Sequence, residues 1–247
     1  MKNLIFVIVM MLAGINLYAG TTQEAIESAN KSGLVVFLVV TDPGNASTQK
    51  AIDIANEAHA KYLKSEVIQM NRSDAANKTL VDKYGVNGAP LPLILVIASN
   101  GVVSGGYTAQ QATADLLVKK IPSPVKADVL KAFSEGKSVF IVVSRKDMTE
   151  KNEVMNTCQQ ACIEMQNNAK LYALDLDDPK EQSFIADLKI DKTITSPQTL
   201  VINSKGQITG TFNDDTSTET LVATAKKLPA AKGCCPSGSG AGCAPKK

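Results

Sequence analysis

The chain contains the same pattern twice. A block of about a hundred residues ends in Lys119-Lys120-Ile121-Pro122, and a second block ends in Lys226-Lys227-Leu228-Pro229. A repeat of this length predicts two domains of one architecture, and 247 residues are enough for two domains of about 100–150 residues. The matched positions are Gly33 with Gly136, Val86 with Ile190, Pro92 with Pro197, Gly101 with Gly206, and Tyr107 with Phe212.

The N-terminus has the pattern of a secretory signal. Met1-Lys2-Asn3 is a short basic start, Leu4 to Leu17 is an apolar run, and Tyr18-Ala19-Gly20 supplies a small residue at a cleavage point. The apolar run is shorter than the roughly 20 residues that a membrane span needs, so a cleaved signal is favoured over a retained anchor. We therefore predict a signal peptide over residues 1–19, export to the periplasm or the outside, and no stable membrane span after cleavage.

Each block alternates between helical and strand patterns. Leu34 to Val40 and Ser138 to Val143 are continuous runs rich in β-branched residues, which is typical of strands buried on both faces. The helix that follows in the first block, predicted over 47–63, is expected to bury Ile52, Ala55, His59 and Tyr62. In each block the order is helix, strand, helix, strand, helix, strand, strand, helix.

This order resembles the thioredoxin fold. Lys83 to Pro90 is similar to the segment that leads to the cis-proline of that family. The resemblance predicts an α/β protein with two tandem thioredoxin-like domains, residues 20–122 and 123–229, each a mixed sheet flanked by helices. It also implies a cis-proline beside the active site. Pro92 and Pro197 are the candidates because they match across the repeat, and Pro90 is the alternative in the first block.

Both positions where such a fold would carry its redox site lack cysteine. Redox-active members of the family place Cys-x-x-Cys where the buried strand meets the next helix, because the helix N-terminus stabilises a thiolate. Here those corners read Asp42-Pro43-Gly44-Asn45-Ala46-Ser47 and Arg145-Lys146-Asp147-Met148-Thr149-Glu150. The buried acid that redox-active members carry on the preceding strand is also missing. We predict that both domains are redox-inactive, with no catalytic residue and no cofactor-binding residue.

Within the two blocks, two cysteines and one histidine are candidates for thiol chemistry or metal binding. Cys158 and Cys162 lie one helical turn apart and share a face with apolar side chains, which favours thiols of the core. A disulfide and a pair of soft-metal ligands are the alternatives for this second thiol pair. His59, the only histidine, is expected at the core or its rim with a hydrogen-bond partner, so no His-rich metal site can form.

The last 18 residues, 230–247, differ in composition from both blocks. They are rich in Gly, Ala, Ser and Pro, which predicts a disordered tail. Cys234, Cys235 and Cys243 lie in it. Three roles stay open: binding of a soft ion such as Cu(I) or Zn(II), or of a metalloid; a disulfide or intermolecular cross-link; and thiol exchange, since Gly-Cys-Cys resembles the mobile C-terminal pairs of some flavin disulfide reductases.

Composition excludes some classes of function. A formal net charge of +2, 4% aromatic residues and no Trp give neither the basic surface nor the stacking platform of a nucleic-acid-binding protein. The family resemblance implies binding of proteins or peptides, in the manner of a chaperone or scaffold, because redox-silent thioredoxin domains in isomerase-like proteins commonly hold polypeptides. An extended peptide is expected beside Pro92 and Pro197. The alternative is a thiol-disulfide oxidoreductase, or a thiol or metal carrier, acting through the tail cysteines.

Overall fold

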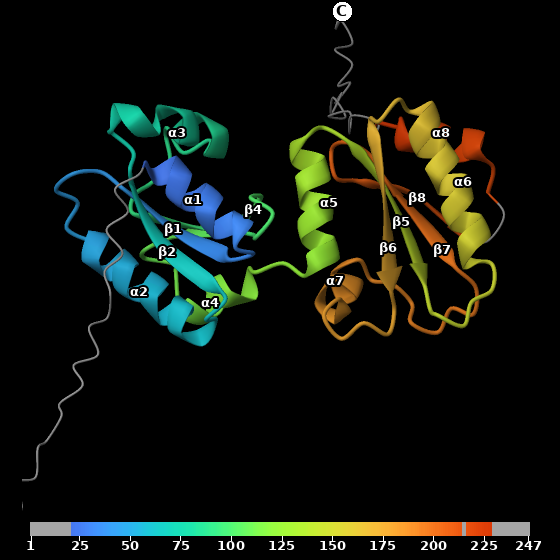
Figure 1. Cartoon of the computed structure of the whole chain (residues 1–247), viewed down its shortest axis with the longest axis horizontal. Coiled ribbons are helices and arrows are strands. Elements are labelled where there is room, and N and C mark those ends of the chain that lie inside the picture. The colour runs from blue at the N-terminus through green and yellow to red at the C-terminus, as the bar shows by residue number, and fades with distance from the viewer. Residues whose placement is uncertain (1–20, 214–215, 229–247) are drawn as a thin grey trace, which may run out of the picture. The chain divides into compact units, whose positions relative to one another are not determined.

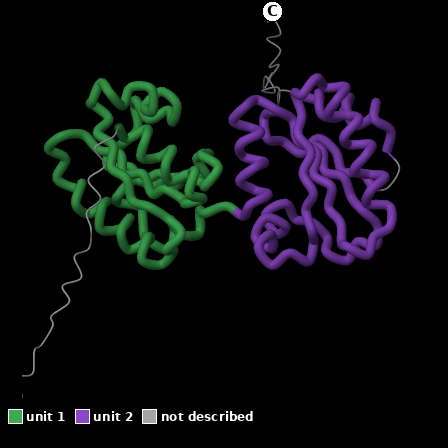
Figure 2. Tube along the Cα trace, in the orientation of Figure 1, with its two compact units in different colours: residues 1–122 green, residues 123–247 purple. Residues whose placement is uncertain are grey.

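The computed structural model describes residues 21–213 and 216–228. The signal-peptide prediction and the predictions for Cys234, Cys235 and Cys243 lie outside the described residues. The chain divides into two compact units, Met1–Pro122 and Ser123–Lys247, which have separate colours in Figure 2.

Unit 1 follows the predicted order of elements (Figure 1). Thr21 opens the first helix with a capping box, in which its side chain and that of Glu24 each accept from the other's backbone, an arrangement that satisfies donors left free at a helix start. The elements are α1 (Thr22–Lys31), β1 (Val35–Thr41), α2 (Thr48–Lys61), β2 (Ser65–Asn71), the 3₁₀ turn η1 (Ala75–Asn77), α3 (Lys78–Tyr84), β3 (Leu93–Ile97), β4 (Val103–Thr108) and α4 (Ala114–Lys119).

Unit 2 repeats this order. Its elements are α5 (Pro124–Ser134), β5 (Ser138–Ser144), α6 (Lys151–Glu164), β6 (Ala169–Asp175), α7 (Gln182–Asp187), β7 (Gln198–Ile202), β8 (Ile208–Asn213) and α8 (Thr218–Ala225). Gly33 and Gly136 both have φ of +71°, and Gly101 and Gly206 have φ of +85° and +75°. The repeat therefore preserves the left-handed positions, which favour glycine.

The two sheets have the same topology. Their strand orders are β2-β1-β3-β4 and β6-β5-β7-β8. The strands β1 and β2 run parallel, as do β5 and β6, and the remaining pairs are antiparallel. These mixed sheets, flanked by helices, confirm the prediction of two tandem thioredoxin-like domains.

The central strand of each sheet is buried on both faces. Side chains of β1 alternate between two cores: Val36, Leu38 and Val40 pack with α1 and α3, whereas Phe37 and Val39 pack with α2 and α4. Unit 2 repeats the division, with α5 and α7 on one face and α6 and α8 on the other. The continuous apolar runs of the sequence follow from this double burial.

The predicted buried face of the second helix was wrong in part. The buried face of α2 consists of Ala51, Ala55 and Ala58, so Ile52, His59 and Tyr62 lie at the rim of the core. Small side chains let the helix pack close to the sheet, which turns the larger ones to the side. Helix α4 begins at Ala114, because Thr113 caps it by accepting from Leu116 N.

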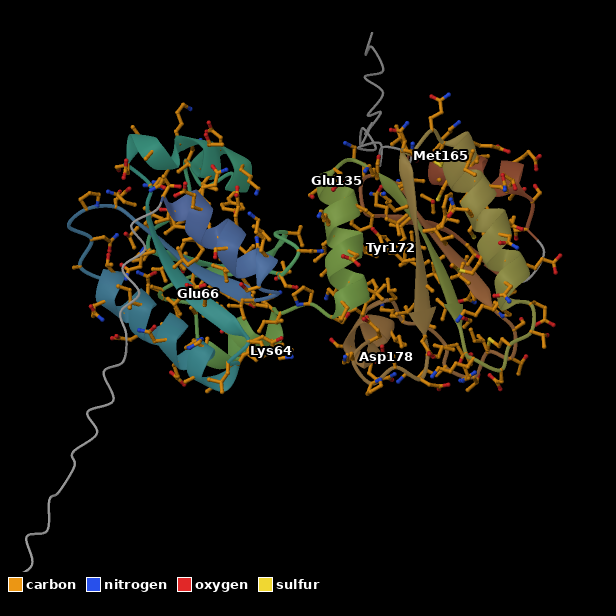
Figure 3. All side chains as sticks on the ribbon, viewed as in Figure 1. Lys64, Glu66, Glu135, Met165, Tyr172 and Asp178 are labelled. Atoms are coloured by element: carbon orange, nitrogen blue, oxygen red, sulfur yellow. The ribbon has the colours of Figure 1, made fainter. Side chains whose placement is uncertain are left out.

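In unit 2 a hydrogen bond ties the edge strand to a helix. The Tyr172 hydroxyl on β6 donates to the Asp128 carbonyl on α5 over 3.1 Å, and Figure 3 shows Tyr172 beside that helix. Within the described ranges, no helix combines the length and the apolar character that crossing a membrane requires.

Candidate functional site

The candidate site of unit 1 lies at the corner where β1 ends and α2 begins. Asn45 occupies this corner, and its side chain makes two contacts. Its Oδ1 accepts from Ser47 N over 3.0 Å, and its Nδ2 donates to the Leu91 carbonyl over 3.4 Å. An amide therefore joins the corner to the loop before β3, at the place where the family resemblance implies a thiol.

The proline prediction is confirmed for one unit and wrong for the other. Leu91–Pro92 is a cis peptide bond, and among the described residues it is the only one. Pro92 rather than Pro90 is therefore the cis-proline of unit 1, and Pro197 is not a cis-proline. Trans is the lower-energy state of a proline bond.

Arg72 fastens the loop before Pro92 to the corner of unit 1. It follows β2, and its guanidinium donates to three acceptors: Asp42 Oδ2 at 2.5 Å, the Ala89 carbonyl at 2.8 Å and the Val86 carbonyl at 3.3 Å. A planar fork of fixed donors suits this task better than a lysine ammonium. The end of β1, the end of β2 and the loop thus share one cation.

Arg145 has the same role in unit 2. Its guanidinium donates to the carbonyls of Ile194, at 2.8 Å, and of Lys192. Its Nε lies 3.5 Å from Asp177 Oδ1. The loop before Pro197 is therefore also fastened to the sheet by an arginine.

The acid and the arginine of this ion pair follow opposite strands in the two units. Thr41 pairs with Asn71 in register, and Ser144 pairs with Asp175. In unit 1 the acid follows the central strand and the arginine follows the edge strand, whereas in unit 2 the arginine follows the central strand and the acid follows the edge strand. What both units retain is a guanidinium between the strand ends and the loop carbonyls.

These arginines were missed by the sequence prediction, although a signal existed. The chain has 26 basic residues, and only Arg72 and Arg145 among them are arginines. An arginine that occurs once in each repeat marks a position where the planar guanidinium is needed and a lysine ammonium would not make the same hydrogen bonds.

The Asp42 carboxylate is held in its charged form. The hydrogen bond from Arg72 is the largest cause that lowers its pKa from the ordinary value of 3.8, and a second bond comes from the Ser73 hydroxyl at 2.8 Å. At neutral pH the corner of unit 1 thus carries a bound ion pair and no titrating base.

The corners lack a thiol nucleophile. Neither contains cysteine. The sulfur at the corner of unit 2 is the Met148 thioether, which accepts from Arg145 N over 3.3 Å and is buried. A thioether does not ionise and is no thiolate nucleophile, so thiol exchange has no starting group at either corner.

Cys158 and Cys162 are buried free thiols, as the core interpretation predicts. Cys158 Sγ lies 3.7 Å from Thr199 Oγ1. Burial raises the pKa of both thiols to about 11, so both are protonated at neutral pH. In the described ranges, no group of three or more His, Cys, Asp or Glu side chains is arranged to hold a metal.

His59 has the hydrogen-bond partner that the sequence predicts. Its Nδ1 lies 3.1 Å from Ser65 Oγ, and that hydroxyl donates to the Tyr62 carbonyl over 2.6 Å. The three residues join the end of α2 to the start of β2. Their contacts are those of a structural link at the rim of the core.

A buried acid in unit 2 escaped the sequence prediction. Glu181 is 2% exposed. Its carboxylate accepts from the Ser123 hydroxyl at 2.5 Å and from Val125 N at 3.0 Å. A carboxylate at a helix N-terminus satisfies free donors and the helix dipole, so Glu181 fixes the start of α5.

Replacement of Arg72 tests the loop fastening. In Arg72→Met, the carbonyls of Val86 and Ala89 lose their donor, and we expect the thermal midpoint of unit 1 to fall by roughly 5–10 °C in calorimetry. Lys78→Met is the control, because the Lys78–Asp82 pair is exposed and such pairs contribute little. Equal midpoints for the two variants would contradict the assignment.

Alkylation tests the buried thiols. Because the folded-state pKa of Cys158 and Cys162 lies above the ordinary value of 9.0, iodoacetamide at pH 8 should label them at least tenfold more slowly in the folded protein than in guanidinium. The same shift adds stability below about pH 9, which is lost as the pH rises through 11. Peptide mass spectrometry reads the labelling, and fast labelling in the folded state would refute the interpretation.

Comparison with known proteins gives structural likeness at low sequence identity. No protein-family model matches the chain, and no match was found among curated proteins. The first two thioredoxin domains of Saccharomyces cerevisiae Eps1p are 11% identical, with 83% of this chain and 96% of that chain covered and a TM-score of 0.31. The N-terminal domain of Enterococcus faecalis AhpF is 12% identical, with 82% and 98% covered and a TM-score of 0.30. Zinc-bound human ERp44 is 12% identical, with 83% and 57% covered and a TM-score of 0.35.

Proposed function

We propose that the chain is an exported protein- or peptide-binding module that works without a dithiol. The observation that carries this proposal is the contact of Asn45 Nδ2 with the Leu91 carbonyl. This contact places the side-chain amide of Asn45, where the family resemblance implies a thiol, against the backbone of the loop before β3. A site of this kind can hold a chain through hydrogen bonds, and it has no group that would attack a disulfide.

The surface around this contact suits an extended chain. Pro43, Ala46 and Pro90 are exposed, and Leu91 is half-buried, so small apolar side chains flank the loop. The contact itself is long for an N–H···O bond, and a peptide N–H can replace Asn45 at the Leu91 carbonyl. Main-chain pairing of that type supplies affinity with little dependence on sequence.

The arginine supports the same function by fixing the loop. Arg72 holds the carbonyls of Val86 and Ala89, so the backbone before Leu91 keeps one conformation before a partner arrives. Rigid recognition elements lose less conformational entropy on binding.

A second function is proposed for the tail. Cys234, Cys235 and Cys243 lie within ten residues of each other, and three thiolates are suitable ligands for soft cations such as Cu(I) and Zn(II). Cys158 and Cys162 are buried and protonated. We therefore assign soft-metal binding or thiol chemistry to the tail cysteines.

Substitution of Asn45 tests peptide binding. Asn45→Ala releases the Leu91 carbonyl for a partner, and we expect affinity for reduced, carboxymethylated lactalbumin to rise about two- to fivefold. Fluorescence anisotropy measures the affinity. Asn87→Ala is the matched control, because this amide bonds to Asp82 instead. The proposal fails if no binding is seen, or if both variants bind like the original protein.

Metal titration tests the tail. The intact chain and a chain that lacks residues 233–247 are titrated with Cu(I) under anaerobic conditions and analysed by native mass spectrometry. We expect one Cu(I) ion on the intact chain and none on the shortened one, because three thiolates are removed. Equal uptake by both would point to Cys158 and Cys162 and contradict the assignment.

The same pair of chains decides the oxidoreductase alternative. Turnover in an insulin-reduction assay by the intact chain alone would favour thiol exchange through the tail. Turnover by both chains would place thiol chemistry outside the tail, and absence of turnover in both favours binding.

A further inference from the structure

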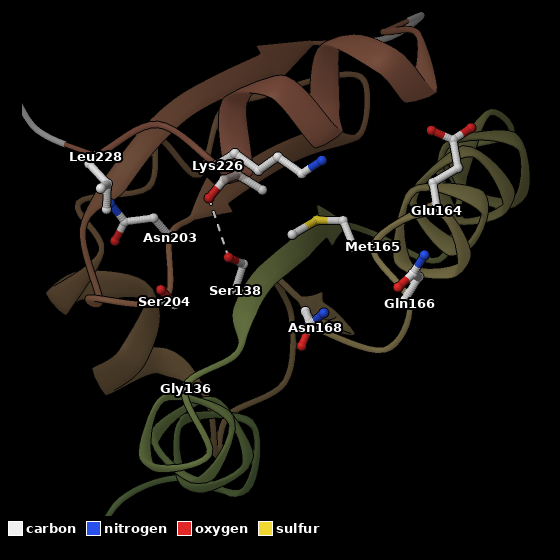
Figure 4. Close-up of a pocket in the computed structure, with 11 residues that line it drawn as sticks. Gly136, Ser138, Glu164, Met165, Gln166, Asn168, Asn203, Ser204, Lys226 and Leu228 are labelled. Atoms are coloured by element: carbon white, nitrogen blue, oxygen red, sulfur yellow. Dashed lines mark hydrogen bonds between the residues drawn. The ribbon is translucent and has the colours of Figure 1, made fainter.

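A pocket in unit 2 lies at the end of the sheet opposite the corner. Its volume is about 500 Å³, within the range of ligand pockets. Figure 4 shows Met165, Ser138 and Lys226 around one opening, together with Gln166, Asn203 and Leu228. The Ser138 hydroxyl donates inward, to the Ala225 carbonyl at 3.3 Å.

The equivalent place in unit 1 holds larger apolar groups. By the matching elements, Tyr62 corresponds to Met165 and Val35 to Ser138. Both Tyr62 and Val35 belong to or pack against the core beneath α2. The pocket of unit 2 is therefore a product of its own sequence, since it replaces a ring and a branched side chain with smaller or flexible ones.

One additional residue opens the pocket further. Three residues separate α2 from β2, whereas four, Met165 to Asn168, separate α6 from β6. Gln166 and Asn167 have φ of +52° and +65°, a region that residues other than glycine seldom adopt. The connection thus bulges beside the opening, and Gln166 lines the wall.

The chain leaves unit 2 at the rim of this pocket. Asn203 Nδ2 donates to the Lys227 carbonyl over 2.9 Å and fixes the exit. Leu228, the next residue, lines the pocket and is 69% exposed. Its counterpart Ile121 packs against the core of unit 1. An apolar side chain at the rim is thus left without the packing that its counterpart has.

We propose that this pocket receives the protein's own C-terminal segment, residues 230–235. The segment starts two residues beyond the rim, so its concentration at the pocket is in the millimolar range. Its Ala, Gly and Cys residues are small enough for the opening, and Lys232 can pair with Glu164, the acidic residue of the lining. Docking would shield Cys234 and Cys235 and leave Cys243 outside. The inference does not depend on peptide binding at the corner of unit 1.

Maleimide alkylation of the pre-reduced full chain tests this proposal. Peptide mass spectrometry gives separate rates for Cys243 and for the Cys234-Cys235 pair. In Met165→Tyr, which gives unit 2 the residue of unit 1, we expect the pair to react about three- to tenfold faster and Cys243 to keep its rate. The rates of Cys158 and Cys162 report whether the variant is folded.

A charge exchange keeps the test decisive if that variant misfolds. Glu164 is exposed at the end of α6, so Glu164→Lys is tolerated by the fold. It should accelerate the pair, and addition of Lys232→Glu should restore the slower rate. Glu153→Lys on the same helix is the control and should change nothing. If the pair reacts at one rate in all folded variants, the proposal is overturned and the pocket is left to a ligand from outside the chain.

Discussion

Complete burial of the central strand is the constraint on which both units depend. Six of the seven residues of β1, and every residue of β5, are buried, so neither strand has room for a polar side chain that seeks solvent. Chemistry is therefore confined to the two ends of the strand. The carboxyl end forms the corner with its arginine, and in unit 2 the amino end opens into the pocket. Helices on both faces of each sheet leave these ends accessible.

The exchanged ion pairs show which part of the corner is required. Asp42 and Arg145 occupy equivalent places with opposite charge, yet each unit ends with a guanidinium on the loop carbonyls. A backbone carbonyl in a loop needs a hydrogen-bond donor. The donor can come from the end of either strand, since Arg72 follows the edge strand and Arg145 follows the central strand. The two corners therefore share a hydrogen-bonding task and not a residue position.

Much of the fold could be predicted from the sequence, because repeated glycines and apolar runs report local constraints. The left-handed conformation of Gly33 and Gly136 and the double burial of β1 leave a pattern within a few residues. The arginine contacts span 14 to 49 positions along the chain, and no local pattern contains them. Pro197 shows the opposite error: its match in sequence to Pro92 did not carry the same peptide geometry. Glu181 was missed because its role at Ser123 depends on a contact 58 residues away.

The positions of the sulfur-containing residues separate the two proposed sites, the corner of unit 1 and the tail. The corners hold an amide and a thioether, and Cys158 and Cys162 are protonated within a core. The remaining cysteines, outside the described residues, follow Leu228 in the sequence. A thiol at the corner would join binding to exchange, because the partner chain and the nucleophile would meet at one loop. In this chain the loop of unit 1 and the cysteines that follow Leu228 belong to different parts of the sequence. The peptide binding proposed at the corner of unit 1 and the thiol chemistry proposed for the tail can therefore change independently, and a substitution that affects one is not expected to affect the other.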